Sequence, residues 1–172
     1  MKKFSTLVVL LLTVLTATAE TRTMSSLNGR LEVTISDEGG LATYAVSYDG
    51  IQVMEPSRLG FEADFGDFTQ GLTMSEFKMT LMDSHVSLKN SKLKKSKYTR
   101  NIVRYTVPFK NTKGQTMTVV FDISKNDIAF RYEIPRPGEN PKCGVIRREV
   151  SSFRFPDGTT TFLCPQIGPM TG

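Results

Sequence analysis

Apolar and polar residues alternate along most of the chain, and this pattern restricts the fold to β-strands. In residues 31–35, Leu, Val and Ile alternate with Glu and Thr, so three apolar side chains would share one face of a strand. No stretch of about ten residues or more after residue 20 shows the 3.6-residue period of an amphipathic helix. The sequence therefore predicts an all-β protein.

Turn residues mark where the first strands end. The run Asp37-Glu38-Gly39-Gly40 follows the first strand, and the dipeptide Asp49-Gly50 separates two strand-like segments, 41–48 and 51–54. A two-residue loop of this kind forms a type I′ turn, in which glycine tolerates the positive φ that the turn requires. These two segments are therefore predicted to form a β-hairpin.

Five later segments are rich in β-branched and aromatic residues and are predicted to be strands. They are residues 101–109, 115–123, 128–134, 145–155 and 160–163. The prolines between residues 135 and 144 cannot donate hydrogen bonds to a neighbouring strand, so an irregular connection is expected there. Many short strands separated by turns favour an antiparallel β-sandwich, in one domain over residues 20–172.

The first 19 residues have the pattern of a secretory signal peptide. Lys2 and Lys3 precede the apolar run 7–15, and the small residues Ala17-Thr18-Ala19 follow it. The apolar run is too short to span a bilayer, and the A-x-A pattern is what a signal peptidase accepts. We expect cleavage after Ala19 and a secreted product, periplasmic if the source is Gram-negative.

A basic segment lies between Asp83 and Asp122, where the sequence contains no acidic residue. Its main cations are Lys89, Lys92, Lys94, Lys95, Lys97, Arg100 and Arg104. Such a patch can bind nucleic acid, anionic lipid or acidic polysaccharide by charge neutralisation. We favour a solvated loop between strands, because Tyr98 alone is available to stack on a base and an exported protein rarely meets nucleic acid.

The two cysteines and the single histidine limit the metal chemistry. Cys143 and Cys164 could pair in an oxidising compartment or remain two buried thiols, and the sequence does not decide between these. A zinc site is not expected, because His85 is the only histidine and neither cysteine lies in a CxxC motif. We expect His85 to be a surface residue.

Carboxylates offer the remaining catalytic or metal-binding candidates. Glu62, Asp64 and Asp67 lie close together around Phe65-Gly66, and such oxygen ligands suit calcium. The spacing is not that of an EF-hand loop, and we favour an edge strand and turn. No Ser/His/Asp set stands out by spacing, so no catalytic residue is assigned.

Several segments in a fixed order resemble the N-terminal domain of glycoside hydrolase family 97. They are residues 41–50, 53–60, 126–134, 153–156 and 160–166. Together they extend over nearly the whole chain after the signal peptide, and the basic segment is the least similar part. Residues 123–137 and 153–166 look most like the exported α-glucosidases of Bacteroidetes.

The resemblance implies a sandwich of the super-sandwich type, followed in the whole protein by a catalytic (β/α)₈ barrel and a small C-terminal β domain. The family's catalytic glutamates and most of its calcium ligands belong to the barrel. One further calcium-binding glutamate follows the segment that matches residues 160–172. The resemblance therefore implies no catalytic, metal or cofactor residue here, leaves substrate-binding residues unassigned, and suggests a sandwich that is incomplete at its C-terminus.

Two functions of different classes are compatible with these observations. In the first, the chain is the non-catalytic leading part of an enzyme that hydrolyses α-linked, starch-derived oligosaccharides, and it packs against the barrel. In the second, it is a free-standing periplasmic carbohydrate-binding module. The first is favoured, because the chain has no Trp and most of its Phe and Tyr residues fall at positions that alternate as core.

Overall fold

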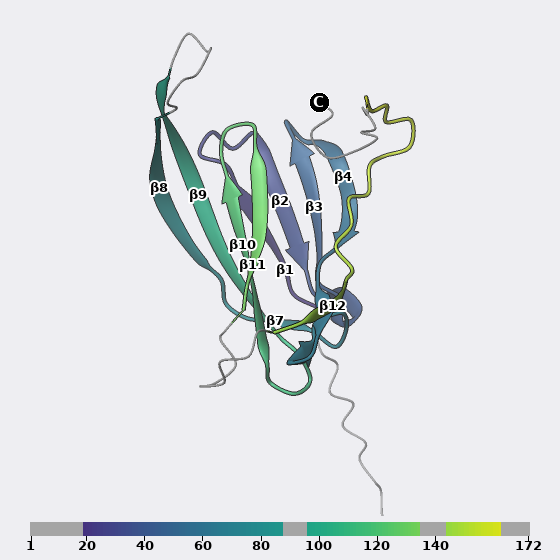
Figure 1. Cartoon of the computed structure of the whole chain (residues 1–172). Helices are drawn as coiled ribbons and strands as arrows, with labels where there is room; N and C mark the ends of the chain where they lie inside the picture. Colours follow the sequence, from purple (N-terminus) through teal and green to yellow (C-terminus); the bar gives the residue numbers. More distant parts are fainter. Residues whose placement is uncertain (1–18, 88–95, 135–143, 163–172) are drawn as a thin grey trace, which may run out of the picture.

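Strands make up most of the computed structural model, which describes residues 19–87, 96–134 and 144–162 (Figure 1). The first sheet has the order β1 (Thr21–Ser25), β2 (Leu31–Ser36), β3 (Thr43–Tyr48) and β4 (Ile51–Arg58). The second has the order β11 (Ile128–Glu133), β10 (Thr116–Ile123) and β9 (Lys97–Lys110), and the far edge of β9 pairs with β7 (Thr73–Met74) and β8 (Lys78–Ser87). The predicted all-β fold is confirmed.

A small third sheet joins the C-terminal part of the described chain to its middle. It consists of β12 (Ile146–Glu149), β5 (Phe61–Ala63) and β6 (Gly66–Asp67). A short 3₁₀ turn, η1 (Glu38–Gly40), connects β2 to β3. Pairing in all three sheets is antiparallel. Among the described residues there is no helix with the length and apolarity needed to span a bilayer.

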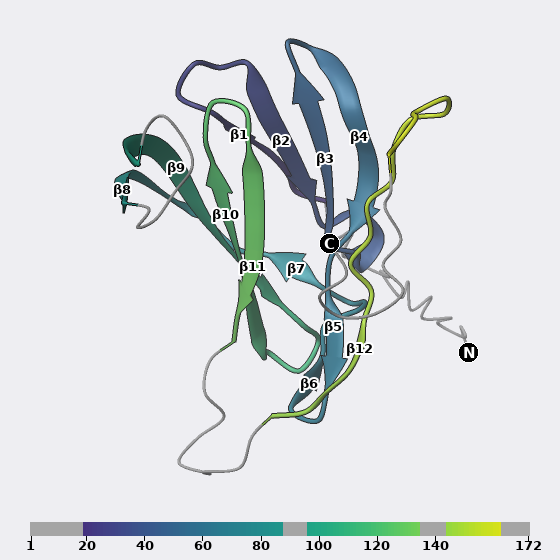
Figure 2. The same cartoon turned by 45° about the horizontal axis from the view of Figure 1, so that its top comes forward.

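The two large sheets face each other and enclose one hydrophobic core (Figure 2). Alternation builds this core directly: in β2, Val33 and Ile35 are fully buried, while Thr34 between them is partly exposed. Tyr44 of β3 lies 5.9 Å from Phe121 of β10, measured between ring centroids. The apolar faces that the sequence predicts therefore meet across the sandwich.

The hairpin predicted from Asp49-Gly50 is confirmed. Asp49 has a φ of 50° and Gly50 a φ of 77°, as a type I′ turn requires. The Arg30 guanidinium forms an ion pair with the Asp49 carboxylate beside the turn and lies over the Tyr48 ring, 4.7 Å from its centroid. Strand β4 continues to Arg58, past the predicted end, and tolerates Pro56 because it is the last strand of its sheet.

The strands predicted at 101–109, 115–123 and 128–134 correspond to β9, β10 and β11. Strand β9 begins earlier, at Lys97, so this part of the basic segment is strand and not loop. The connection predicted between residues 135 and 144 falls almost wholly outside the described residues, as do residues 88–95 of the basic segment.

Two predictions for the C-terminal part are wrong. The strand expected at 145–155 is reduced to β12, and residues 160–162 form no strand. Phe162 is fully exposed, so alternation alone does not make a strand where no partner strand accepts its hydrogen bonds. Residue 163 lies outside the described residues. The turn expected at Pro156-Asp157-Gly158 is present, with a hydrogen bond of 3.2 Å from the Thr159 N–H to the Pro156 carbonyl.

Candidate functional site

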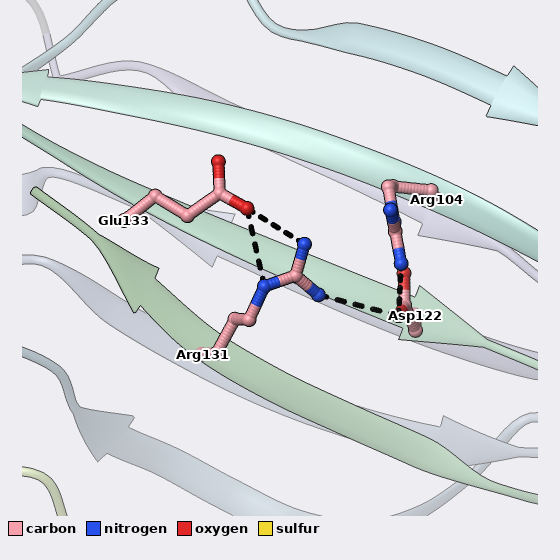
Figure 3. Close-up of polar contacts among 4 residues, drawn as sticks. All are labelled: Arg104, Asp122, Arg131 and Glu133. Atoms are coloured by element: carbon pink, nitrogen blue, oxygen red, sulfur yellow. Dashed lines mark hydrogen bonds and ion pairs between the residues drawn. The ribbon is translucent and has the colours of Figure 1, made fainter.

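A ladder of charged side chains crosses the outer face of the second sheet (Figure 3). Arg104 of β9 binds both oxygens of Asp122 on β10, at 2.6 and 2.7 Å. Arg131 of β11 donates to Asp122 at 3.5 Å and to Glu133 at 2.6 Å. Two cations thus meet two anions, and the ladder is electrically balanced. Val120 lies on the same face, outside the core, and is almost completely buried.

The protonation states of this ladder do not suit acid catalysis. The hydrogen bond from Arg104, followed by the charges of Arg104 and Arg131, lowers the pKa of Asp122 despite its partial burial. A glycosidic general acid needs a raised pKa, so that it carries a proton at neutral pH. We interpret the ladder as a structural element of the sheet face.

The carboxylates around Phe65-Gly66 lie on the β5–β6 hairpin, and each has its own protein partner. The predicted turn is present and β6 is an edge strand, but Glu62 lies on β5, the middle strand of its sheet. Asp67 accepts from the Thr69 N–H and hydroxyl at 2.8 and 2.7 Å, and these hydrogen bonds are the main cause of its lowered pKa. Asp64 accepts from the Val145 N–H at 3.1 Å. Glu62 forms an ion pair of 3.7 Å with Arg148.

No group of three or more His, Cys, Asp or Glu side chains within the described residues could hold a metal ion. The carboxylates named above are therefore not brought together as calcium ligands. The calcium implied by the family resemblance therefore has no fitting set of side chains among the described residues.

The remaining sequence candidates also lie apart from one another. His85 is exposed on β8, and its Nδ1 is 3.0 Å from the Thr99 hydroxyl, as expected for a surface residue. In the basic segment, Arg100 pairs with Asp127 at 2.9 Å, so acids from a neighbouring turn and strand compensate both of its arginines. Cys143 and Cys164 lie outside the described residues, and their pairing stays open.

The most distinctive surface is the C-terminal seam, which we define as residues 150–155 together with strands β4 and β11 beside them. Backbone hydrogen bonds hold these residues along β4: Val150 N–H to Gly60 carbonyl at 2.9 Å, and Ser152 N–H to Arg58 carbonyl at 3.0 Å. The Glu55 N–H donates to the Arg154 carbonyl at 2.8 Å. In Figures 1 and 2, this segment runs upward beside β4.

Tyrosine hydroxyls tie the same segment to the inside of the sandwich. Tyr44 of β3 donates to the Ser152 carbonyl at 3.1 Å. The Tyr132 hydroxyl of β11 is hydrogen-bonded to the Ser151 hydroxyl and accepts from the Gly60 N–H at 2.9 Å. Burial, reinforced by the neighbouring Tyr132, raises the pKa of Tyr44 to about 12. Burial likewise raises the pKa of Tyr132. Both hydroxyls therefore keep their protons at neutral pH.

A glycine is required at this junction. Gly60 has a φ of 128°, and an added Cβ would lie 2.1 Å from the Phe68 carbonyl oxygen. Only glycine adopts this conformation with the backbone so close. The sequence contains this residue within the segment 53–60, but no local pattern could have identified its role, because its neighbours come from residues 68, 132 and 150.

An apolar groove opens along the seam between the two sheets. It has a volume of about 270 Å³. Its walls include Tyr44 and Met54 of the first sheet, Ile128 and Phe130 of the second, and Phe153 and Phe155 of the C-terminal segment. Phe153 and Phe155 are 60% and 47% exposed, although Phe153 lies 6.1 Å from Phe130, measured between ring centroids.

The lining indicates which kind of ligand the groove can take. Carbon atoms dominate its surface, with the Asn126 side chain at one end. A sugar brings many hydroxyl groups, each of which needs a hydrogen-bond partner when it leaves water. The groove therefore suits the apolar side chains of a polypeptide better than it suits a carbohydrate.

Comparison with known proteins agrees with the fold. A solved β-arabinopyranosidase is 32% identical, with a TM-score of 0.77, and the match covers 88% of this chain and 24% of that one. A glycoside hydrolase family 97 enzyme from Pseudoalteromonas sp. strain K8, solved with panose and with acarbose, shares the fold at a TM-score of 0.69 and 24% identity. That match covers 79% of this chain and 20% of the enzyme.

A curated relative from Streptomyces bingchenggensis (strain BCW-1), named "Probable retaining alpha-galactosidase", is 26% identical over 124 residues. The match covers 72% of this chain and 18% of that relative, so the chain spans less than a quarter of the lengths of these proteins. The family model described as Glycosyl-hydrolase 97 N-terminal matches residues 24–171. The chain therefore belongs to glycoside hydrolase family 97 and corresponds to its N-terminal domain.

Proposed function

We propose that this chain is the non-catalytic N-terminal β-sandwich part of an exported family 97 enzyme that hydrolyses α-glycosidic bonds. The observation that carries this proposal is the C-terminal seam. There the chain leaves the sandwich beside an unfilled apolar groove lined by both sheets. A catalytic barrel later in the polypeptide is the partner that we propose for this groove.

Two further findings support a non-catalytic role. The part matched here covers 18 to 24% of the length of each relative. The acid best placed in a polar cluster, Asp122, has a lowered pKa, whereas glycosidic cleavage needs one carboxyl that stays protonated. The sandwich would then support the catalytic part and contribute to one wall of its substrate pocket.

For the substrate, we propose α-glucosidic bonds of starch-derived oligosaccharides. The support is the resemblance of residues 123–137 and 153–166 to α-glucosidases. The Pseudoalteromonas enzyme, solved with panose and with acarbose, supports an oligosaccharide ligand in the whole protein. A second candidate is a galactoside or arabinopyranoside, which the names of the Streptomyces relative and of the solved β-arabinopyranosidase favour.

Export and calcium dependence are part of the same proposal. The Lys2-Lys3, apolar run and Ala17-Thr18-Ala19 pattern supports cleavage after Ala19, and mass spectrometry of the exported protein would locate its first residue. A product that retains Met1 would contradict export by this route. We propose that calcium binds in the catalytic part of the longer protein.

Activity assays test the central proposal. Residues 20–172, purified alone, should give no turnover of p-nitrophenyl α-glucoside above a matched blank, because no general acid or base is identified among the described residues. The longer polypeptide should cleave that substrate, and the α-galactoside and β-arabinopyranoside analogues test the second candidate. Turnover by residues 20–172 would refute the non-catalytic role.

The nucleotide sequence beyond residue 172 distinguishes the enzyme part from a free-standing carbohydrate-binding module. An open reading frame that continues into a barrel supports the enzyme. A stop codon together with measurable binding of maltooligosaccharides to residues 20–172 would support the module instead. We expect no such binding, because the groove offers few hydrogen-bonding groups.

A further inference from the structure

On one side of the sandwich the second sheet extends past the first, and its outermost strand there, β8, has an uncovered apolar side. Leu81 of β8 is directly opposite Val103 of β9, and Met79 is opposite Tyr105, so each pair shares one face of the sheet. Val103 and Tyr105 are 2% and 6% exposed, whereas Leu81 and Met79 are 62% and 56% exposed. The core thus ends abruptly between β9 and β8.

The position of β1 explains this boundary. The Tyr105 hydroxyl donates to the Ser25 carbonyl at 3.0 Å and accepts from the Ser25 N–H at 3.1 Å. Strand β1 therefore lies over β9, and it is the last strand of its sheet. In Figure 1, β8 lies to the left of every strand of the first sheet. Among the described strands, none lies over Met79 and Leu81.

The outer edge of β1 has unpaired backbone groups beside this apolar surface. The Ser26 N–H donates to Leu31 of β2, while the Ser25 N–H and carbonyl point away from β2, toward Tyr105. Backbone groups alternate in direction along a strand, so those of Thr21 and Thr23 also point away from β2. We call this edge of β1, together with Met79 and Leu81, the open flank.

We infer that a β-strand from the polypeptide beyond residue 172 pairs with the open edge of β1 and covers Met79 and Leu81. This inference rests on the proposed function, in which the chain is part of a longer enzyme. Neighbouring strands lie about 4.8 Å apart, so a strand added next to β1 would lie over β8 in the same way that β1 lies over β9. Its alternate apolar side chains would face β8, and it would extend the first sheet over β8.

The charge of the β8–β9 hairpin argues for the same chain and against a second copy as the occupant. Sequence 78–104 contains six lysines but one acid, Asp83, while its two arginines pair with Asp122 and Asp127. Two copies joined at this flank would bring two such basic hairpins together, and like charges in contact oppose association. A strand from the same polypeptide brings no second basic hairpin and so avoids this repulsion. The solved β-arabinopyranosidase has roughly three quarters of its length outside the part matched here.

Cysteine labelling of the longer polypeptide tests the inference. Leu81→Cys and its control Thr80→Cys are each placed in a background in which the native cysteines are serine. Thr80 is an exposed neighbour on the opposite face of β8, paired with Arg104. The rate of reaction with a maleimide is divided by the rate of the same variant in guanidinium chloride, which removes differences in thiol reactivity. We expect the Leu81→Cys thiol to react at least about ten-fold more slowly than the control.

Equal normalised rates for the two thiols in the longer polypeptide would overturn the inference. So would protection of Leu81→Cys that appears in the 172-residue chain alone and increases with its concentration, because a second copy would then be the occupant. Slower amide hydrogen exchange at Thr21 and Thr23 in the longer polypeptide than in the 172-residue chain would support it independently. Loss of glycosidase activity would refute the proposed function without affecting the labelling result.

Discussion

The two flanks of this sandwich differ in how their edge strands are covered. At the C-terminal seam, residues 150–155 run beside the edge of β4, and Tyr44 and Tyr132 fix them with hydrogen bonds. At the open flank, β1 and β8 keep free edges, and Leu81 stays 62% exposed. An edge strand with apolar side chains invites pairing with another chain. A sandwich with one continuous hydrophobic core can therefore still have apolar side chains exposed at one edge.

Both flanks nevertheless expose apolar side chains, at the seam mainly Phe153 and Phe155. We therefore expect residues 20–172 to be poorly soluble or partly unfolded when produced alone. A sharp, cooperative thermal transition from a clean monomer would contradict this and would indicate a complete, independent module.

The largest effect should come from the core next to the seam. Phe121 is fully buried, 5.9 Å from Tyr44 and 5.7 Å from Phe130 between ring centroids. Phe121→Ala should lower the free energy of unfolding by about 3–5 kcal/mol, because it removes contacts and leaves a cavity. Leu81→Ala at the open flank should cost less than about 1 kcal/mol. Denaturant unfolding of both variants measures the difference, and similar losses would mean that the open flank is already covered.

An intermediate effect is expected on the outer face of the second sheet. Asp122→Asn should lower the free energy of unfolding at pH 7 by about 1–2 kcal/mol, because it breaks a bidentate pair with the Arg104 guanidinium. The control is Asp127→Asn, whose side chain is 66% exposed, and it should cost about 0–1 kcal/mol.

The pH dependence of Asp122→Asn has a definite sign. The folded protein lowers the pKa of Asp122 below its unfolded value of about 4. The stabilisation is therefore present above pH 4 and is lost as the pH falls through the folded pKa. The difference between wild type and Asp122→Asn should shrink over that acidic range. A difference that grows with acid would contradict the ion-pair interpretation.

Local sequence signals predicted the parts of the fold that depend on neighbouring residues. The alternation in β2 and the Asp49-Gly50 turn specify their own geometry, and both were confirmed. Strand β8 was not predicted, because its sequence Lys-Met-Thr-Leu-Met-Asp has apolar residues on both faces and no clear alternation. Strand β1 was also missed, since Thr21–Ser25 contains one apolar residue, Met24.

The candidate surfaces depended on contacts between distant residues, and the sequence could not show these. The basic segment looked free of acids because Asp122 and Asp127 lie far from Arg104 and Arg100 in sequence, although they lie beside them in the fold. The seam joins residues 55–60 to residues 150–154, and the alternation in the latter suggested a regular strand that is not present. Pairing partners, more than local preference, decide such cases.

A smaller effect is expected for the hydrogen bond that anchors the seam. Tyr44→Phe removes the donor to the Ser152 carbonyl and should lower the free energy of unfolding by about 0.5–1.5 kcal/mol at neutral pH. The folded pKa of Tyr44 is raised to about 12, above the unfolded value of about 10. The free energy of unfolding of the wild type should therefore decrease as the pH rises from 10 to 12, and this decrease should be smaller in Tyr44→Phe. An unchanged alkaline profile would contradict the burial of this hydroxyl at the seam.

The smallest effect on unfolding is expected at the open flank itself. The double variant Met79→Thr, Leu81→Thr replaces two exposed apolar side chains by a residue that favours strands. In the 172-residue chain, the free energy of unfolding should change by no more than about 0.5 kcal/mol, because these side chains have no partner to lose. The control is Thr80→Ser on the opposite face, which should also leave the free energy of unfolding unchanged. In the longer polypeptide, the same double variant should be destabilising, because the added strand that we infer would lose its apolar contacts with β8. Equal effects in the two contexts would show that nothing covers Met79 and Leu81 in either.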